Sequence, residues 1–184
     1  MTARHQRKRI VGEARRFVTR HFDVEGQTNT CLYLAAAACM VAQKHGLRLI
    51  LQAGSARWPR VTDQTDDGVE PNVFEYVWES DHPASRAARA AGLMPEMHVW
   101  AADPAANEVV DLTTGFWPAQ CREILGVDWK APNPPPYFWG PVDRLPTLAC
   151  YEPNLEATML ADAFVRRELR RRERELLDFQ TLTP

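Results

Sequence analysis

The sequence predicts an α+β protein whose strands form an antiparallel sheet, and three observations support this class. Apolar residues recur at helical spacing near both ends of the chain, in residues 7–22 and 154–179. Residues 32–45 are rich in alanine and apolar almost all round, which is typical of a buried helix. After Gly46 the apolar period changes to two, which indicates strands. Helices followed by short strands and a final helix favour helices packed on an antiparallel sheet.

The first segment, residues 7–22, predicts a surface helix packed through one stripe. Ile10, Ala14 and Val18 share that stripe, whereas arginines occupy the other side. A polar, turn-rich stretch at residues 23–30 follows and offers several N-cap residues for the next helix. That next helix, residues 32–45, is expected at the centre of the core.

The middle of the chain predicts short strands. Residues 73–79 are aromatic and β-branched, and Asp103-Pro104-Ala105-Ala106-Asn107 has the composition of a turn, so the two segments around it predict a β-hairpin. Residues 59–71 predict a polar, acidic loop. The expected strands are 47–53, 73–79, 97–102 and 108–113, with a short helix at 85–91.

The chain of 184 residues is expected to form one domain, because domains of ~100 to 150 residues are the commonest. We divide it into an N-terminal basic helix, a core, a wrapping loop rich in proline and aromatic residues, and a C-terminal helix. These parts correspond to residues 1–25, 26–115, 116–153 and 154–184.

Charge is balanced overall, with 22 basic and 24 acidic residues and a net charge of −2. The whole chain therefore does not have the charge of a polyanion binder, and no nucleic-acid role is expected. Basic residues gather in residues 4–20, and residues 63–81 are acidic without a lysine or arginine. The acidic stretch is either a solvated surface or a surface for a cationic ligand or protein partner.

Location is predicted to be cytoplasmic. The basic N-terminus is not followed by an apolar segment, and the longest apolar run, residues 31–42, is shorter than the ~20 residues that span a bilayer. The four cysteines form no C-x-x-C pair, which favours reduced thiols. We therefore expect no membrane association.

Cys31 is the candidate nucleophile. It lies between the polar loop and the predicted buried helix, and the partial positive charge of a helix N-terminus stabilises a thiolate. The alternative is that Cys31 is a small core residue. Cys39 lies two turns further along the same predicted helix, and no acid–base partner is assigned to Cys121 or Cys150, so all three are interpreted as structural.

His98 and Asp111 are the candidate partners of Cys31. If the hairpin turn is centred between Pro104 and Ala105, His98 faces Asp111 across the two strands, and a carboxylate there orients the imidazole. The three residues then form a triad of nucleophile, base and orienting group.

Two other interpretations of these residues stay open. A cross-strand pair of His98 and Asp111 is also a common structural contact, and cysteine, histidine and aspartate can bind zinc. The remaining histidines have no ligand spacing that supports a metal site. We expect neither a metal nor a cofactor.

The motifs H-x-W at residues 98–100 and D-x-T at residues 111–113, after a cysteine at a helix start, resemble the transglutaminase-like cysteine superfamily. That superfamily also contains bacterial peptidases and the arylamine N-acetyltransferases. The resemblance implies a papain-like core in which a helix carrying Cys31 packs against an antiparallel sheet carrying His98 and Asp111. It also implies that Cys31 is the nucleophile, His98 the general base and acid, and Asp111 the orienting residue.

The chain departs from the family pattern before the cysteine, where Gln27-Thr28-Asn29-Thr30 replaces the usual glycine. Gln27 is either an oxyanion donor beside the backbone N–H of Cys31 or a loop and capping residue. The chain is also too short for the additional acetyltransferase domain, and it has no glycine-rich loop for coenzyme A.

The expected function is that of a thiol-dependent hydrolase or acyltransferase acting on an amide or ester bond through an acyl-cysteine intermediate. The substrate is a peptide, a protein or a small amide or ester, and the acceptor, water or an amine, is left open. The alternative is a catalytically silent protein with this fold that serves as a protein-binding module.

Overall fold

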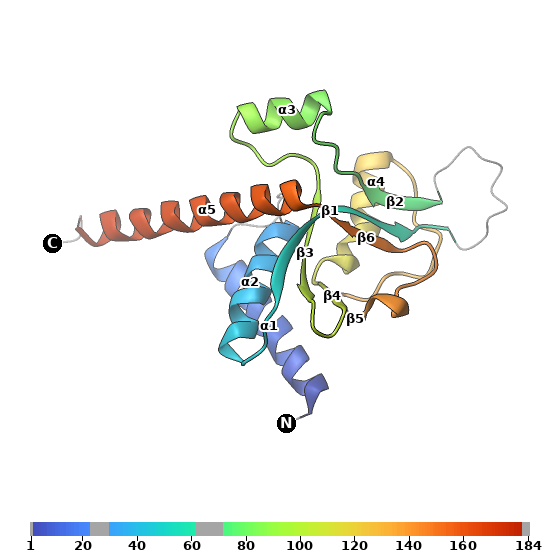
Figure 1. Ribbon diagram of the computed structural model, residues 1–184, viewed down its shortest axis with the longest axis horizontal. Coiled ribbons are helices and arrows are strands. Elements are labelled where there is room, and N and C mark those ends of the chain that lie inside the picture. The colour runs from blue at the N-terminus through green and yellow to red at the C-terminus, as the bar shows by residue number, and fades with distance from the viewer. Residues whose placement is uncertain (1, 23–29, 62–71, 182–184) are drawn as a thin grey trace.

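A computed structural model describes residues 2–22, 30–61 and 72–181 of the chain. It has the α+β architecture that the sequence predicts, with an antiparallel curled sheet and helices packed against it (Figure 1). Among the described residues the sheet has six strands, which are β1 (Ile50–Pro59), β2 (Val73–Tyr76), β3 (His98–Asp103), β4 (Glu108–Asp111), β5 (Phe138–Pro141) and β6 (Cys150–Pro153).

The helices lie around this sheet. Helix α2 packs between α1 and strand β3, whereas α5 packs on β1 and then extends away from the sheet (Figure 1). No helix in the described ranges is both long and apolar enough to cross a membrane. The helices are α1 (Ala3–His21), α2 (Thr30–Lys44), α3 (Pro83–Ala90), α4 (Trp117–Leu125) and α5 (Leu155–Thr181), with short 3₁₀ turns at Thr114–Phe116 and Val142–Arg144.

Helix α2 is buried on two sides, as its composition predicts. Leu34 and Ala38 belong to a core shared with α1, and Leu32 and Ala35 belong to a second core shared with β3 and α5. Small alanine side chains allow the neighbouring elements to approach the helix closely. The partners on the two sides include Ile10, Ala14 and Val18 of α1, Val99 of β3, and Ala157 and Ala161 of α5.

Strand β1 has partners along both edges. Its residue Gly54 pairs with His98 of β3 and with Pro153 of β6, so these two strands lie on opposite edges of β1. A Cβ at Gly54 would overlap the carbonyl oxygen of Glu152, which explains why a glycine is needed at this position. β2 and β3 lie one after the other along the edge of β1 that is opposite β6. β3 pairs with the first half of β1 and β2 with its second half.

The β3–β4 hairpin forms, but its register differs from the expected one by two residues. Ala102 pairs with Val109, and the turn takes up residues 104–107. The Asp103 carboxylate accepts hydrogen bonds from the N–H groups of Ala105 and Ala106, and Asn107 adopts a left-handed φ of 52°. The turn is therefore centred one residue later than predicted, and the even displacement of the pairing keeps each side chain on its expected face.

The segment at residues 116–153 was expected to be irregular, and this expectation was wrong. It contains helix α4 and strands β5 and β6. Pro118 lies in the first turn of α4, where its missing N–H removes no helical bond, and Gly126 ends the helix with a φ of 70°. The predicted terminal helices are present as α1 and α5.

Candidate active site

Cys31 is the second residue of helix α2, and its side chain is half-buried. The residue thus lies at a helix start, as the polar loop before it predicts, where helix dipoles favour a negative sulfur. Gln27, the candidate oxyanion donor, lies outside the described residues, as do Asp63, Asp66, Asp67 and Glu70 of the acidic stretch.

His98 and Asp111 form a buried ion pair. His98 is the first residue of β3 and Asp111 the last of β4, with exposed side-chain fractions of 2% and 1%. The His98 Nε2 donates to Asp111 Oδ2 over 2.7 Å. In the observed register, which pairs Ala101 with Val110, Asp111 lies opposite Trp100, so His98 and Asp111 are diagonal neighbours on one face. The predicted contact between the two side chains is therefore present despite the displaced register.

The Asp111 carboxylate accepts four hydrogen bonds in the described structure. Thr113 donates to Oδ1 through its backbone N–H at 2.7 Å and its hydroxyl at 2.6 Å, while Tyr151 donates to Oδ2 at 2.7 Å beside His98. Burial alone would raise the pKa of Asp111, but the charge on His98 and the hydrogen bonds from His98 and Thr113 lower it. The D-x-T motif thus has a physical role, because its threonine holds the carboxylate in its ionised form.

The His98 imidazole is held in its charged form. Burial lowers its pKa, but the charge and hydrogen bond of Asp111, followed by the hydrogen bond and charge of Cys31, raise the pKa to about 10. Nε2 faces Asp111, so Nδ1 is the nitrogen available to the Cys31 thiol. The imidazole therefore connects the cysteine at the start of α2 to the carboxylate on β4.

Aromatic rings surround the His98 imidazole. Tyr76 and Trp100 stack on it nearly in parallel, with ring centroids 5.5 and 6.1 Å away, and Trp117 contacts it edge-on at 5.1 Å. Trp100 in turn donates from its indole N–H to Gln52 over 3.0 Å. The H-x-W motif therefore places a tryptophan on the same sheet face as the histidine, where it fixes the plane of the ring.

The other three cysteines have environments that disfavour a thiolate or bury the sulfur. Burial raises the pKa of Cys39 to about 12. Cys121 is fully buried, with its sulfur 3.6 Å from the carbonyl oxygen of Val127. Burial and a hydrogen bond to Glu152 raise the pKa of Cys150. These contacts agree with the structural role predicted for each of them.

Tyr151 is the site residue that sequence reasoning missed. It lies on β6, within the segment expected to be irregular, and it is 40 residues from Asp111. Burial, followed by the charge and hydrogen bond of Asp111, raises the pKa of Tyr151 well above its ordinary value, so its hydroxyl stays a donor. Among the described residues, no group of three or more histidine, cysteine, aspartate or glutamate side chains is arranged to hold a metal ion.

Protein-family models, curated proteins and solved structures were all compared with this chain, and none of them matches it. The resemblance to the transglutaminase-like superfamily therefore depends on the residues of the chain itself. Those residues are Cys31, the H-x-W motif that begins at His98, and the D-x-T motif that begins at Asp111.

Proposed function

We propose that this protein is a cysteine-dependent hydrolase or acyltransferase with a transglutaminase-like core, acting on an amide or ester bond. The observation that carries the proposal is the buried relay from Cys31 through His98 to Asp111, with the 2.7 Å contact between the last two at its end. A helix bearing the cysteine and two strands bearing the other residues support the superfamily resemblance. Such a relay activates a thiol and supplies a proton donor at the same place.

The first half of the reaction is acyl transfer to sulfur. With the proton already on His98, Cys31 attacks the carbonyl carbon as thiolate and forms a C–S bond. The C–N or C–O bond of the substrate then breaks as His98 donates its proton to the departing amine or alcohol. His98 is left neutral, and the acyl group remains on Cys31 as a thioester.

The second half returns the enzyme to its starting state. Neutral His98 accepts a proton from the acceptor, which is water for hydrolysis or an amine for transfer, as the acceptor attacks the thioester carbonyl. The C–S bond breaks, the acyl group leaves as an acid or a new amide, and the thiolate and imidazolium are restored. Asp111 keeps its charge throughout and holds the imidazole in place.

The direct test is the rate at which iodoacetamide modifies each cysteine at neutral pH, measured by mass spectrometry of digested protein. Cys31 is expected to react faster than Cys39, Cys121 or Cys150, because the thiolate is the attacking species. His98→Ala should slow the reaction at Cys31 strongly. Asp111→Asn should slow it less, because the imidazole remains but loses its charged partner.

A matched control is Cys39→Ser, which removes a half-buried thiol on the same helix and should leave the Cys31 rate unchanged. Circular dichroism checks that each variant is folded, since an unfolded chain exposes every thiol. Equal labelling of all four cysteines in folded protein, or a Cys31 rate unaffected by His98→Ala, would favour the protein-binding module. Trapping of acyl groups as hydroxamates by added hydroxylamine then distinguishes a working thioester from a merely reactive thiol.

A further inference from the structure

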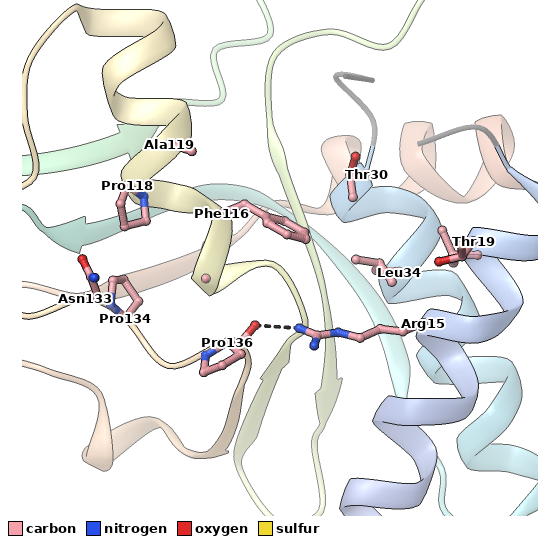
Figure 2. Close-up of a pocket in the computed structure, with 12 residues that line it drawn as sticks. Arg15, Thr19, Thr30, Leu34, Phe116, Pro118, Ala119, Asn133, Pro134 and Pro136 are labelled. Carbon is pink, nitrogen blue, oxygen red and sulfur yellow. Dashed lines mark hydrogen bonds between the residues drawn. The ribbon is translucent and has the colours of Figure 1, made fainter. Parts of the chain in front are cut away.

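A cavity of about 560 Å³ lies between helices α1 and α2 on one side and the start of α4 with the proline-rich segment on the other (Figure 2). Its volume suits a small organic group. Most of the residues that line it are apolar or small, and they include Val18, Leu34, Phe116, Pro118, Pro134 and Pro136.

Two walls of the cavity are formed by residues that are close in sequence to members of the candidate active site. Thr30, which lines it, is the residue before Cys31, and Leu34 lies one helical turn beyond Cys31. On the other wall, Phe116 and Pro118 flank Trp117, whose ring contacts His98 edge-on at 5.1 Å. The cavity is thus lined by residues next in sequence to Cys31 and to Trp117.

Among the described residues that line the cavity, Arg15 is the one that is ionisable. Its side chain is half-buried and reaches from α1 toward Pro136 (Figure 2). Its Nη2 donates to the carbonyl oxygens of Leu112 at 3.2 Å and Pro136 at 2.8 Å, and its guanidinium carbon lies 5.9 Å from the ring centre of Tyr137.

No carboxylate in the described part of the chain forms an ion pair with Arg15. Two backbone carbonyls fix its position, and neither they nor any other described residue supplies an anionic partner for its charge. A guanidinium has five N–H donors, and a carboxylate can accept from two of them at once. An arginine that is partly desolvated beside apolar walls attracts an anion more strongly than one in water.

From this combination we propose that the cavity binds an apolar carboxylate, with its hydrocarbon part between Leu34 and Phe116 and its carboxylate on Arg15. The substrate class is then an amide or ester with an apolar group attached close to its reactive carbonyl. The far end of that apolar group carries the carboxylate. This assignment of substrate rests on the proposed function, but the binding of the carboxylate itself does not need catalysis.

The test is isothermal titration calorimetry of the full-length Cys31→Ala variant with 4-phenylbutyrate and with its uncharged amide. The acid is expected to bind at least tenfold more tightly than the amide. Arg15→Gln should remove that preference, and Arg15→Lys should restore part of it, because lysine keeps the charge but not the paired donors. Phe116→Ala should weaken the binding of both compounds.

The matched control is Arg16→Gln, which removes an exposed arginine on the same helix and should change neither affinity. Equal binding of acid and amide, binding of neither, or an acid preference that persists in Arg15→Gln would each overturn the proposal. Because this experiment uses protein without the nucleophile, binding without any thiol reactivity in the wild type would contradict the proposed function and not the carboxylate site.

Discussion

Two ion pairs of this protein have the same length and opposite surroundings. His98 Nε2 lies 2.7 Å from Asp111 Oδ2, and Arg166 Nε lies 2.7 Å from Asp162 Oδ2 on helix α5. The side chains of the first pair are 2% and 1% exposed, whereas those of the second are 68% and 49% exposed. Distance alone therefore does not distinguish a buried pair from one on the surface.

The difference lies in what replaces water around the charges. Removing an ion pair from water is costly unless other polar groups compensate for the lost hydration. Around Asp111 these groups are the hydroxyls of Thr113 and Tyr151 and one backbone N–H. Around Asp162 and Arg166 solvent remains, so that pair needs no such support. The surrounding donors thus indicate which pair the fold is built to maintain.

The sharpest test of this comparison is Asp111→Ala. The substitution leaves a buried histidine without its partner, so it should lower the free energy of unfolding by about 3 to 5 kcal/mol. Urea titration followed by circular dichroism measures the change. In the double variant Asp111→Ala/His98→Ala, adding His98→Ala should lower the free energy of unfolding much less than His98→Ala does in the wild type. If the two changes in the free energy of unfolding simply add in the double variant, the two side chains are not energetically coupled.

Stability should also depend on pH through His98. Its pKa is about 10 in the folded protein, whereas the ordinary value for histidine, which applies to the unfolded chain, is 6.5. Between these two pH values the folded state keeps a proton that the unfolded state loses. The contribution is therefore fully present below pH 6.5 and falls as pH rises toward 10, by on the order of 1 kcal/mol for each pH unit. Urea titrations at pH 6.5, 7.5 and 8.5 measure this slope.

An independent measurement comes from the His98 ring. Nuclear magnetic resonance of the imidazole nitrogens should show a doubly protonated ring at pH 8. A neutral ring at that pH would mean that Asp111 and Cys31 do not hold the charge, and the contrast with the surface pair would weaken.

Tyr151→Phe should have a smaller effect. It removes one hydrogen bond to a charged carboxylate, which is worth about 1.5 to 3 kcal/mol, while leaving the ring and its packing in place. The Cys31 labelling rate should respond too, because Oδ2 is shared with His98. Tyr137→Phe serves as a control, since it removes the same hydroxyl at a residue that packs against the core around Ile10. Equal stability of wild type and Tyr151→Phe would show that His98 and Thr113 alone are enough to stabilise the buried Asp111 carboxylate.

Asp162→Ala should have the smallest effect, at most about 0.5 kcal/mol, because an exposed helical pair is solvated with or without its partner. Comparison of urea midpoints at low and high salt checks this value. A loss approaching that of Asp111→Ala would remove the distinction between the two pairs.

Sequence reasoning located the parts of the site that depend on local pattern. Cys31 follows from a polar loop before an alanine-rich helix, and the common face of His98 and Asp111 follows from the period of two in a hairpin. The register could not be derived as reliably, because Asp103 and Asn107 support a four-residue turn whose centre lies one residue later than expected. Because the pairing is displaced by two residues, an even number, His98 and Asp111 still lie on the same face of the sheet.

Tyr151 and the cavity beyond Phe116 depend on contacts between distant segments. Strands β5 and β6 have four residues each, and prolines lie at their ends, so they show too little alternation to predict. Their conformation follows from pairing with β4 and β1, which no local pattern encodes. The same applies to Arg15, whose contacts are with carbonyls about a hundred residues away.

Gly54 carries no functional group, but a mutational scan for activity should identify it as intolerant. A side chain at Gly54 would displace the carbonyl of Glu152. Glu152 directly follows Tyr151, which donates a hydrogen bond to Asp111. The two pairing partners of Gly54 are His98 and Pro153, so a shift at this residue reaches both ends of the hydrogen-bond network around Asp111. Even Gly54→Ala should therefore lower the labelling rate of Cys31 as a substitution of His98 or Asp111 does, although glycine itself contributes no side chain to the candidate site.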